Sequence, residues 1–260
     1  ELAIQHTISE GKLTPKAIIP VDLFGLPARY RLIEEIAKKY DLKVIEDAAQ
    51  SFGATIRDKK VGTFGDVAAT SFYPAKPLGC YGDGGAIFTN DDILAEKMRK
   101  MVNHGMEDRY YYKYIGINSR LDSVQAAILS VKLKRLESYN SSRIKAADYY
   151  DNCFKENYKI SIPKRSNYST HVFHQYTLKL QDVDRDKLCA HLQNKEIPFG
   201  VYYPIPLHRQ DPYFEERFNQ DDFINTNHLC ESVLSLPMHT ELTPKQMDFI
   251  SQSILEFINE

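Results

Sequence analysis

Hydrophobic and polar positions follow two alternating patterns in the first hundred residues of the chain. Four short apolar runs, bounded by glycine, proline or charged residues, are typical of buried strands. They cover residues 17–24, 43–47, 67–72 and 86–89. Between the first two runs, from Leu32 to Tyr40, apolar residues recur at helical spacing. This strand–helix–strand order predicts a parallel pair of strands with a right-handed crossover.

The second half of the chain has a different pattern. After a predicted helix at 91–104 and a tyrosine-rich loop at 110–118, residues 121–156 are strong helix formers and predict one or two long helices. The remainder alternates between strands and helices. We expect strands at 172–180 and 199–203, a helix at 184–195, and further helices up to the C-terminus. The pattern therefore predicts a large α/β domain over residues 1–135 and a small α+β domain over residues 136–260.

Composition and charge exclude several classes of protein. Of the 260 residues, 43% are hydrophobic and 26% are charged, as in ordinary globular proteins. A net charge of -2 without a basic run gives no reason to expect nucleic acid as a partner. No apolar run approaches the ~20 residues that span a bilayer, and no signal peptide opens the chain. The four cysteines are widely spaced, which predicts reduced thiols in a cytoplasmic protein and no metal site.

Lys76 is the candidate catalytic residue. It stands between an apolar strand and a glycine-rich turn, flanked by Pro74 and Pro77, with no other charge until Asp83. Such surroundings desolvate an ammonium group and lower its pKa, which suits an amine that forms a Schiff base. The alternative is an ordinary solvated lysine. The spacing alone leaves both interpretations open.

Three further side chains suit a pyridine cofactor. Asp47, at the end of a predicted strand, can keep a pyridine nitrogen protonated, or it can be the N-cap of a following helix. Gln50 can donate to the ring hydroxyl, or it is simply a loop amide. Ser71 ends another strand and can bind the cofactor phosphate. Together with Lys76, these residues predict pyridoxal 5'-phosphate (PLP) as the cofactor.

Several segments of the chain closely resemble the PLP-dependent nucleotide-sugar aminotransferases of the DegT/DnrJ/StrS type. They are residues 46–54, 71–79, 82–86, 103–105, 116–122, 125–127, 203–208 and 236–239. The resemblance runs in order from about Lys16 to the C-terminus. It implies an α/β fold of PLP fold type I, with a large domain built on a mixed or parallel sheet and a small α+β domain. Because family members usually carry more residues at the N-terminus, it also implies that this large domain is incomplete.

The resemblance assigns a role to each matching position of the cofactor site. Lys76 would bind the cofactor covalently and move the substrate proton. Asp47 would pair with the ring nitrogen, Gln50 would contact the ring oxygen, and Ser71 would bind the phosphate. Asn118 would reach the phosphate in the neighbouring subunit, so the resemblance implies a homodimer with shared active sites.

The resemblance also implies a substrate side of the site. Arg120, His208 and His239 would lie toward the sugar nucleotide. From the residues alone, Arg120 can equally pair with Asp122, and the two histidines can be structural. The tyrosines at 110–112 stack on a nucleobase or pack at a dimer interface, and we favour the interface.

The implied reaction is amino transfer from glutamate to a UDP- or dTDP-linked keto sugar. We expect a 3-keto sugar, with a 4-keto sugar next, and an amino sugar destined for surface polysaccharide such as the O-antigen of lipopolysaccharide. The main alternative is a truncated, non-catalytic member that serves as a binding or assembly protein. Two other classes are weaker. A sugar dehydratase would carry histidine in place of Lys76, and a PLP enzyme for free amino acids would not need the matches at 118–120 and 203–208.

Overall fold

The structure is a computed structural model that describes residues 1–216 and 218–259. The chain divides into two compact units. The first comprises Glu1–Asn140 and Ser166–His174, and the second comprises Ser141–Arg165 and Gln175–Glu260. The helix α5 (Leu136–Phe154) begins in the first unit and continues in the second.

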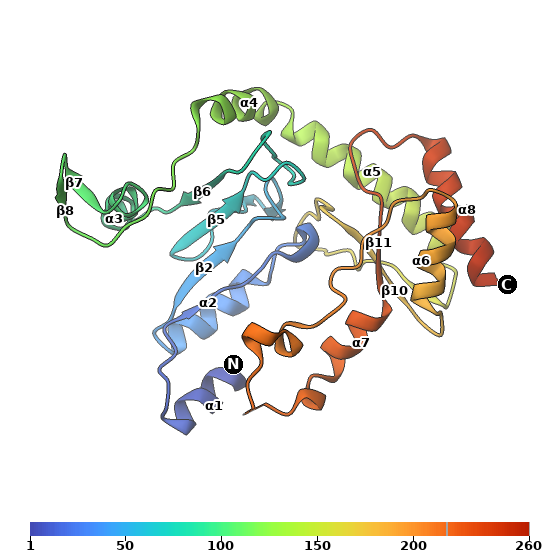
Figure 1. Ribbon diagram of the computed structural model, residues 1–260, viewed down its shortest axis with the longest axis horizontal. Coiled ribbons are helices and arrows are strands. Elements are labelled where there is room, and N and C mark those ends of the chain that lie inside the picture. The colour runs from blue at the N-terminus through green and yellow to red at the C-terminus, as the bar shows by residue number, and fades with distance from the viewer. Residues whose placement is uncertain (217, 260) are drawn as a thin grey trace. The chain divides into compact units, whose positions relative to one another are not determined.

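A four-stranded sheet forms the centre of the first unit (Figure 1). Its order is β1 (Ala17–Ile18), β2 (Lys43–Asp47), β5 (Val67–Ser71) and β6 (Gly85–Phe88). The first three strands are parallel, and β6 is antiparallel to β5. The expected parallel pair is thus present. The first strand is shorter than predicted. It ends at Ile18, and Leu23 and Phe24 of the predicted run belong to the 3-10 helix Leu23–Gly25, in which Phe24 adopts a positive φ of 59°.

An apolar layer on one side of this sheet explains the position of α2 (Tyr30–Lys39), the helix that connects β1 to β2. Ala37, Leu42 and Val44 are buried together there. Ile33 of α2 and Ile4 of α1 (Leu2–Glu10) pack against them. The helical spacing recognised in the sequence is therefore the buried face of α2.

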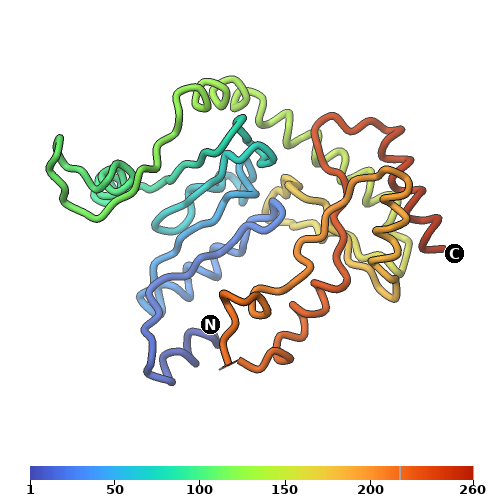
Figure 2. Tube along the Cα trace, viewed as in Figure 1, coloured from blue at the N-terminus to red at the C-terminus, as the bar shows by residue number. Residues whose placement is uncertain are grey.

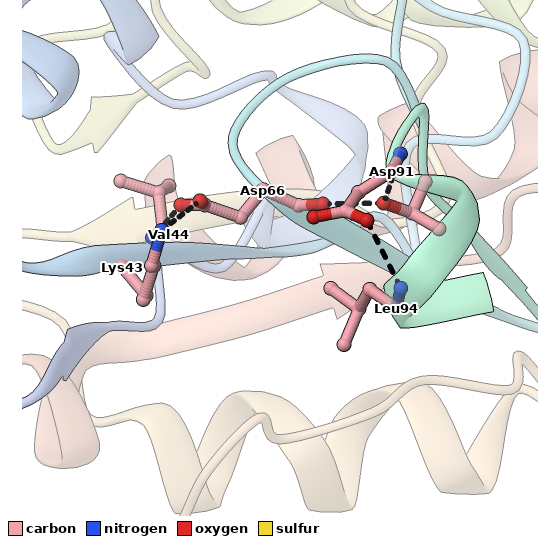
Figure 3. Close-up of polar contacts among 6 residues, drawn as sticks. Lys43, Val44, Asp66, Asp91 and Leu94 are labelled. Carbon is pink, nitrogen blue, oxygen red and sulfur yellow. Dashed lines mark hydrogen bonds and ion pairs between the residues drawn. The ribbon is translucent and has the colours of Figure 1, made fainter. Parts of the chain in front are cut away.

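Asp66 ties three elements of the first unit together (Figure 3). Its carboxylate accepts hydrogen bonds from the Lys43 ammonium, at 2.8 Å, and from the Val44 backbone N–H, at 2.9 Å. Its backbone carbonyl accepts the hydroxyl of Thr89. Thr89 in turn accepts the backbone N–H of Asp91, the N-cap of α3 (Asp92–Val102). These bonds fix the start of β5 against β2 and against the first turn of α3.

The rest of the first unit consists of short hairpins and a helix. The hairpins pair β3 (Thr55–Ile56) with β4 (Lys59–Lys60), and β7 (Met106–Asp108) with β8 (Tyr111–Tyr112). The helix is α4 (Ser123–Leu133). The expected tyrosine-rich loop therefore contains a strand, and in Figure 1 the β7–β8 hairpin lies beyond α3, away from the sheet.

Residues 166–174 return to the first unit from a distant part of the sequence. The backbone N–H of Thr170 donates to the Thr55 carbonyl, and that of Val172 donates to the Gly25 carbonyl, at 2.9 and 3.0 Å. Val172 is also buried in an apolar cluster with Ala48 and other residues of this unit. The strand expected at 172–180 consequently begins only at Tyr176.

The second unit contains a three-stranded antiparallel sheet and helices. Figure 2 traces the path of the backbone through these elements. The strands, in sheet order, are β11 (Val233–Leu236), β10 (Tyr176–Leu180) and β9 (Ile160–Ser161). Besides the continuation of α5, the helices are α6 (Arg185–Asn194), α7 (Ile224–Ser232) and α8 (Pro244–Asn259). Short 3-10 turns occupy Leu207–Arg209, Asp211–Tyr213 and Gln220–Asp222.

The prediction of a strand at 199–203 is wrong. Gly200 forms a single isolated bridge with Ser235, and the chain then leaves the sheet. Pro204 and Pro206 follow at once, and proline has no backbone N–H to extend a ladder. Within residues 1–216 and 218–259, no helix combines the length and the apolar character needed to cross a membrane.

Candidate active site

The turn after β5 carries Lys76 and is held by its own backbone. The N–H of Lys76 donates to the Tyr73 carbonyl, at 2.9 Å, and the N–H of Cys80 donates to the Phe72 carbonyl, at 2.8 Å. Gly79 packs directly on the start of this turn, because a Cβ atom built on it would lie 2.4 Å from the Pro74 carbonyl oxygen. Only glycine permits this approach. The side chain of Cys80 is fully buried beneath the turn.

The Lys76 amine is half-buried and electrostatically perturbed. Burial holds its pKa below the ordinary value, and the nearby Asp47 carboxylate acts in the opposite direction. Within the described part of the chain, Lys76 forms no ion pair that would fix its ammonium form. A desolvated amine of this kind has a larger neutral, nucleophilic fraction than a surface lysine.

Asp47 ends β2, the strand next to the one that leads to Lys76. Its Oδ1 atom accepts the N–H of Ala49 at 3.0 Å. Residues 48–53 form turns and not a helix, so the alternative of a helix N-cap is wrong. In the register of the sheet, Asp47 pairs with Ala69 of β5. Asp47 therefore ends one of two neighbouring parallel strands, and Lys76 lies in the turn that follows the other, at the edge where open α/β sheets bind ligands.

Gln50 and Ser71 lie close in sequence to these strand ends, and both are half-buried. The Oε1 atom of Gln50 accepts the backbone N–H of Phe24 at 2.5 Å, which leaves the Nε2 atom to serve as a donor. The Oγ atom of Ser71 accepts the backbone N–H of Tyr73 at 3.2 Å, so its hydroxyl hydrogen remains for a further acceptor. Both side chains thus keep the donor that their predicted roles require.

Asp22 is a site residue that the sequence reasoning missed. Its carboxylate is fully buried and accepts three hydrogen bonds, from the Ala28 N–H at 2.8 Å, the Tyr30 hydroxyl at 2.8 Å and the Ser51 hydroxyl at 2.6 Å. Its own N–H donates to the Asp47 carbonyl at 3.0 Å. Burial raises the pKa of Asp22. The residue anchors the turn between Asp47 and Ser51, and its place as a charged residue within an apolar run was the available signal.

Asn118 and Arg120 lie in the same unit but line a different space. Both are exposed, and Arg120 donates to the Oδ1 atom of Asn103 at 3.2 Å, not to Asp122. They border a cavity of about 1160 Å³ that runs along β6 and α3. Lys76 and Asp47 are not among its lining residues. Within this single chain, the structure therefore does not bring Asn118 and Arg120 to the amine.

The two candidate histidines belong to the second unit. The Nε2 atom of His208 is 3.0 Å from Oδ1 of Asn227, and its ring stacks on Phe223 with centroids 4.1 Å apart. His239 is exposed and accepts the N–H of Glu241 at 3.2 Å. His239 also borders a small apolar cavity of about 180 Å³. Their assignment to the substrate stays a prediction.

Comparison with known proteins identifies the family. The profile described as the DegT/DnrJ/EryC1/StrS aminotransferase family matches residues 2–255. A "Pleiotropic regulatory protein" of Geobacillus stearothermophilus is 44% identical over 93% of this chain and 65% of its own length. A "UDP-2-acetamido-2-deoxy-3-oxo-D-glucuronate aminotransferase" of Pseudomonas aeruginosa is 42% identical over 94% of this chain and 67% of its own length. The chain thus spans about two thirds of the length of these relatives.

Solved structures agree with this assignment. A DegT/DnrJ/EryC1/StrS aminotransferase from Brucella abortus superposes with a TM-score of 0.93 at 44% identity, covering 99% of this chain and 68% of that one. NtdA from Bacillus subtilis, solved with the bound cofactor PMP, superposes with a TM-score of 0.87 at 31% identity, covering 96% and 59%. The expected α/β fold class is confirmed by these likenesses.

Proposed function

Because the chain belongs to the DegT/DnrJ/EryC1/StrS aminotransferase family, we propose that its protein is a PLP-dependent aminotransferase that acts on nucleotide-linked keto sugars. One observation carries the proposal. The half-buried amine of Lys76, with a lowered pKa and no ion pair among the described residues, lies within the electrostatic reach of Asp47 at the end of the neighbouring strand. A solvated surface lysine would have neither the burial nor the lowered pKa.

The side chains at the strand ends fit PLP. The aldehyde of the cofactor requires an amine, which Lys76 supplies. Its ring nitrogen requires a carboxylate, and the Oδ2 atom of Asp47 accepts no hydrogen bond from the described residues. The Nε2 atom of Gln50 and the hydroxyl of Ser71 remain as donors for the ring oxygen and the phosphate. The fully buried Ala48 offers a small side chain beside Asp47.

When bound, PLP supplies an electron sink for the charge that develops when a proton leaves the substrate Cα atom. The chain's own residues perform the remaining tasks. Asp47 keeps the ring nitrogen protonated by charge. The amine of Lys76 would accept and return the proton, and its lowered pKa brings it closer to the range in which an amine can do both. Gln50 would orient the ring, and Ser71 would hold the phosphate.

The proposed donor is glutamate, and the proposed acceptor is a UDP- or dTDP-linked keto sugar. We favour the 3-keto class over the 4-keto class. The name of the Pseudomonas aeruginosa relative, which specifies a 3-oxo sugar on UDP, supports this choice at 42% identity. The product would be an amino sugar for surface polysaccharide such as O-antigen. Arg120, His208 and His239 are the proposed contacts to the sugar nucleotide.

We further propose a homodimer in which Asn118 and Arg120 complete the neighbouring subunit's site. The support is the separation of these residues from Lys76, since they line the cavity along β6 instead. Exposed apolar side chains lie close to them in the sequence, including Ile115 at 97% and Ile117 at 64%. Large apolar side chains exposed to this degree suit a protein interface. Four free cysteines support a reducing, cytoplasmic location.

Two measurements test the proposal. Purified protein mixed with PLP should develop the absorbance band of a protonated imine, and Lys76→Ala should abolish it. Lys134→Ala, at an exposed position, is the matched control and should keep the band. With glutamate, a panel of UDP- and dTDP-linked 3-keto and 4-keto sugars should yield amino sugar. A wild-type protein that gives no band with PLP would contradict the cofactor assignment.

A second candidate is a non-catalytic binding or assembly protein. The name of the Geobacillus stearothermophilus relative favours it. It predicts no transamination with any member of the sugar panel, even at saturating PLP and glutamate. Product formation that depends on Lys76 excludes this candidate.

A further inference from the structure

One face of α4 lies against the turn that follows Lys76. Gln125, Leu129 and Lys132 are spaced four and three residues apart, so they share one side of the helix. Leu129 is buried in an apolar cluster with Leu78 and Cys80 of that turn. The two polar residues on either side of Leu129 bind the backbone of the same turn.

Gln125 holds the far end of the turn. Its Oε1 atom accepts the backbone N–H of Tyr81 at 2.8 Å. Its Nε2 atom is so close to Gly82 that a Cβ atom built there would lie 3.0 Å away. The amide therefore fixes the chain at Tyr81, and a side chain at position 82 would crowd it.

Lys132 holds the middle of the turn. Its ammonium donates a hydrogen bond to the backbone carbonyl of Gly79, and it lies 5.5 Å from the centroid of the Tyr81 ring. Lys132 is half-buried and forms no ion pair with residues 1–216 or 218–259. A charged donor to a carbonyl is stronger than a neutral one, particularly where water is partly excluded.

The position of Gly79 is transmitted to Lys76 through direct backbone contact. Gly79 packs against the carbonyl groups of Tyr73 and Pro74. The Tyr73 carbonyl accepts the N–H of Lys76. A shift of Gly79 would therefore displace the segment from which the Lys76 side chain projects.

We propose that Lys132 and Gln125 are positioning residues, which hold the turn carrying Lys76 in the conformation that the amine needs to meet a cofactor at the end of β2. This inference rests on the proposed function for its chemical meaning. The contacts of Lys132 and Gln125 with this turn, which we call the clamp, are a property of the chain and can be measured without cofactor.

The experiment compares wild type with Lys132→Met, Lys132→Arg, Gln125→Met and the control Lys134→Met. Met retains the apolar stem of lysine and removes its charge. Lys134 serves as the control because its exposed side chain makes no hydrogen bond or ion pair with the described residues. Backbone amide exchange of the cofactor-free protein is followed in the peptide covering residues 74–82. In parallel, Lys76 is treated with sub-saturating PLP and borohydride, and the fraction labelled is measured by peptide mass spectrometry.

Lys132→Met and Gln125→Met should each raise exchange at 74–82 about tenfold or more, since a hydrogen bond with a charged or well-aligned partner is lost. They should also lower labelling of Lys76. Lys132→Arg should restore both toward wild type, and Lys134→Met should change neither. Unchanged exchange at 74–82, or a rise that is equal in β2 and α2, overturns the clamp. Failure of wild-type Lys76 to label counts against the proposed function alone, because the exchange data still decide the clamp.

Discussion

Glu46 should make the stability of this protein fall as the pH rises toward neutrality. Its side chain is fully buried on β2 and accepts the backbone N–H groups of Gly62, at 2.7 Å, and Phe64, at 2.9 Å. Burial outweighs these two hydrogen bonds and raises the pKa of Glu46 from 4.5 to about 7. The folded protein therefore binds this proton more tightly than the unfolded chain does.

The magnitude follows from the two pKa values. A group that titrates near 7 when folded and near 4.5 when unfolded contributes about 3 kcal/mol to the free energy of unfolding. This contribution is fully present below pH 4.5 and is lost as the pH rises through about 7. Glu46→Gln cannot ionise, so its free energy of unfolding does not show this loss as the pH rises. The NH2 group of the glutamine faces one of the two backbone N–H donors, which lowers stability by an amount that does not depend on pH.

Urea unfolding at several pH values between 4.5 and 8 checks this prediction. The free energy of unfolding of the wild type should fall by about 3 kcal/mol relative to Glu46→Gln over this range. Glu156→Gln, at an exposed position where the side chain makes no hydrogen bond or ion pair with the described residues, controls for the removal of one negative charge. Wild-type and Glu46→Gln curves that run parallel throughout would refute the argument that burial dominates at this carboxylate.

Three further predictions concern the scaffold of the site. Tyr30→Phe removes one donor from the buried Asp22 carboxylate and should lower the free energy of unfolding by about 1–2 kcal/mol; no change in urea midpoint would mean that water replaces the phenol. Gly79→Ala places a Cβ atom 2.4 Å from the Pro74 carbonyl oxygen and should cost about 1–3 kcal/mol with weaker PLP binding; full binding in an absorbance titration would contradict the close approach. Asp91→Ala removes the N-cap of α3 and should cost about 1 kcal/mol in thermal unfolding followed by circular dichroism; an unchanged curve would show that the cap is dispensable.

The elements that place the predicted cofactor residues were predictable, because their signals are local. Apolar runs ended by polar residues predicted β2 and β5, and helical spacing predicted α2. Asp47 and Lys76 both follow such runs. Since parallel strands present their carboxyl ends at one edge, the placement of these two residues on the same edge of the sheet could be expected from the amino-acid sequence alone.

Features that depend on contacts between distant parts of the chain were not predictable. The acceptor role of Asp22 requires Ser51, which is 29 residues away. Residues 172–174 were assigned to the strand that follows them, because nothing local shows that the Val172 N–H donates to the Gly25 carbonyl. No local pattern indicates that Gln50 turns its oxygen toward Phe24. Such partners are selected by packing, which a single sequence does not encode locally.

Cys80 gives the molecule a built-in reporter. Its thiol is sealed from solvent, donates to the Phe72 carbonyl at 3.0 Å, and lies four residues after Lys76. An alkylating reagent can reach it only while the surrounding segment is transiently open, whereas Cys153 and Cys189 are partly accessible at all times. The rate at which Cys80 is alkylated therefore measures how often the segment around Lys76 opens, and no label has to be introduced.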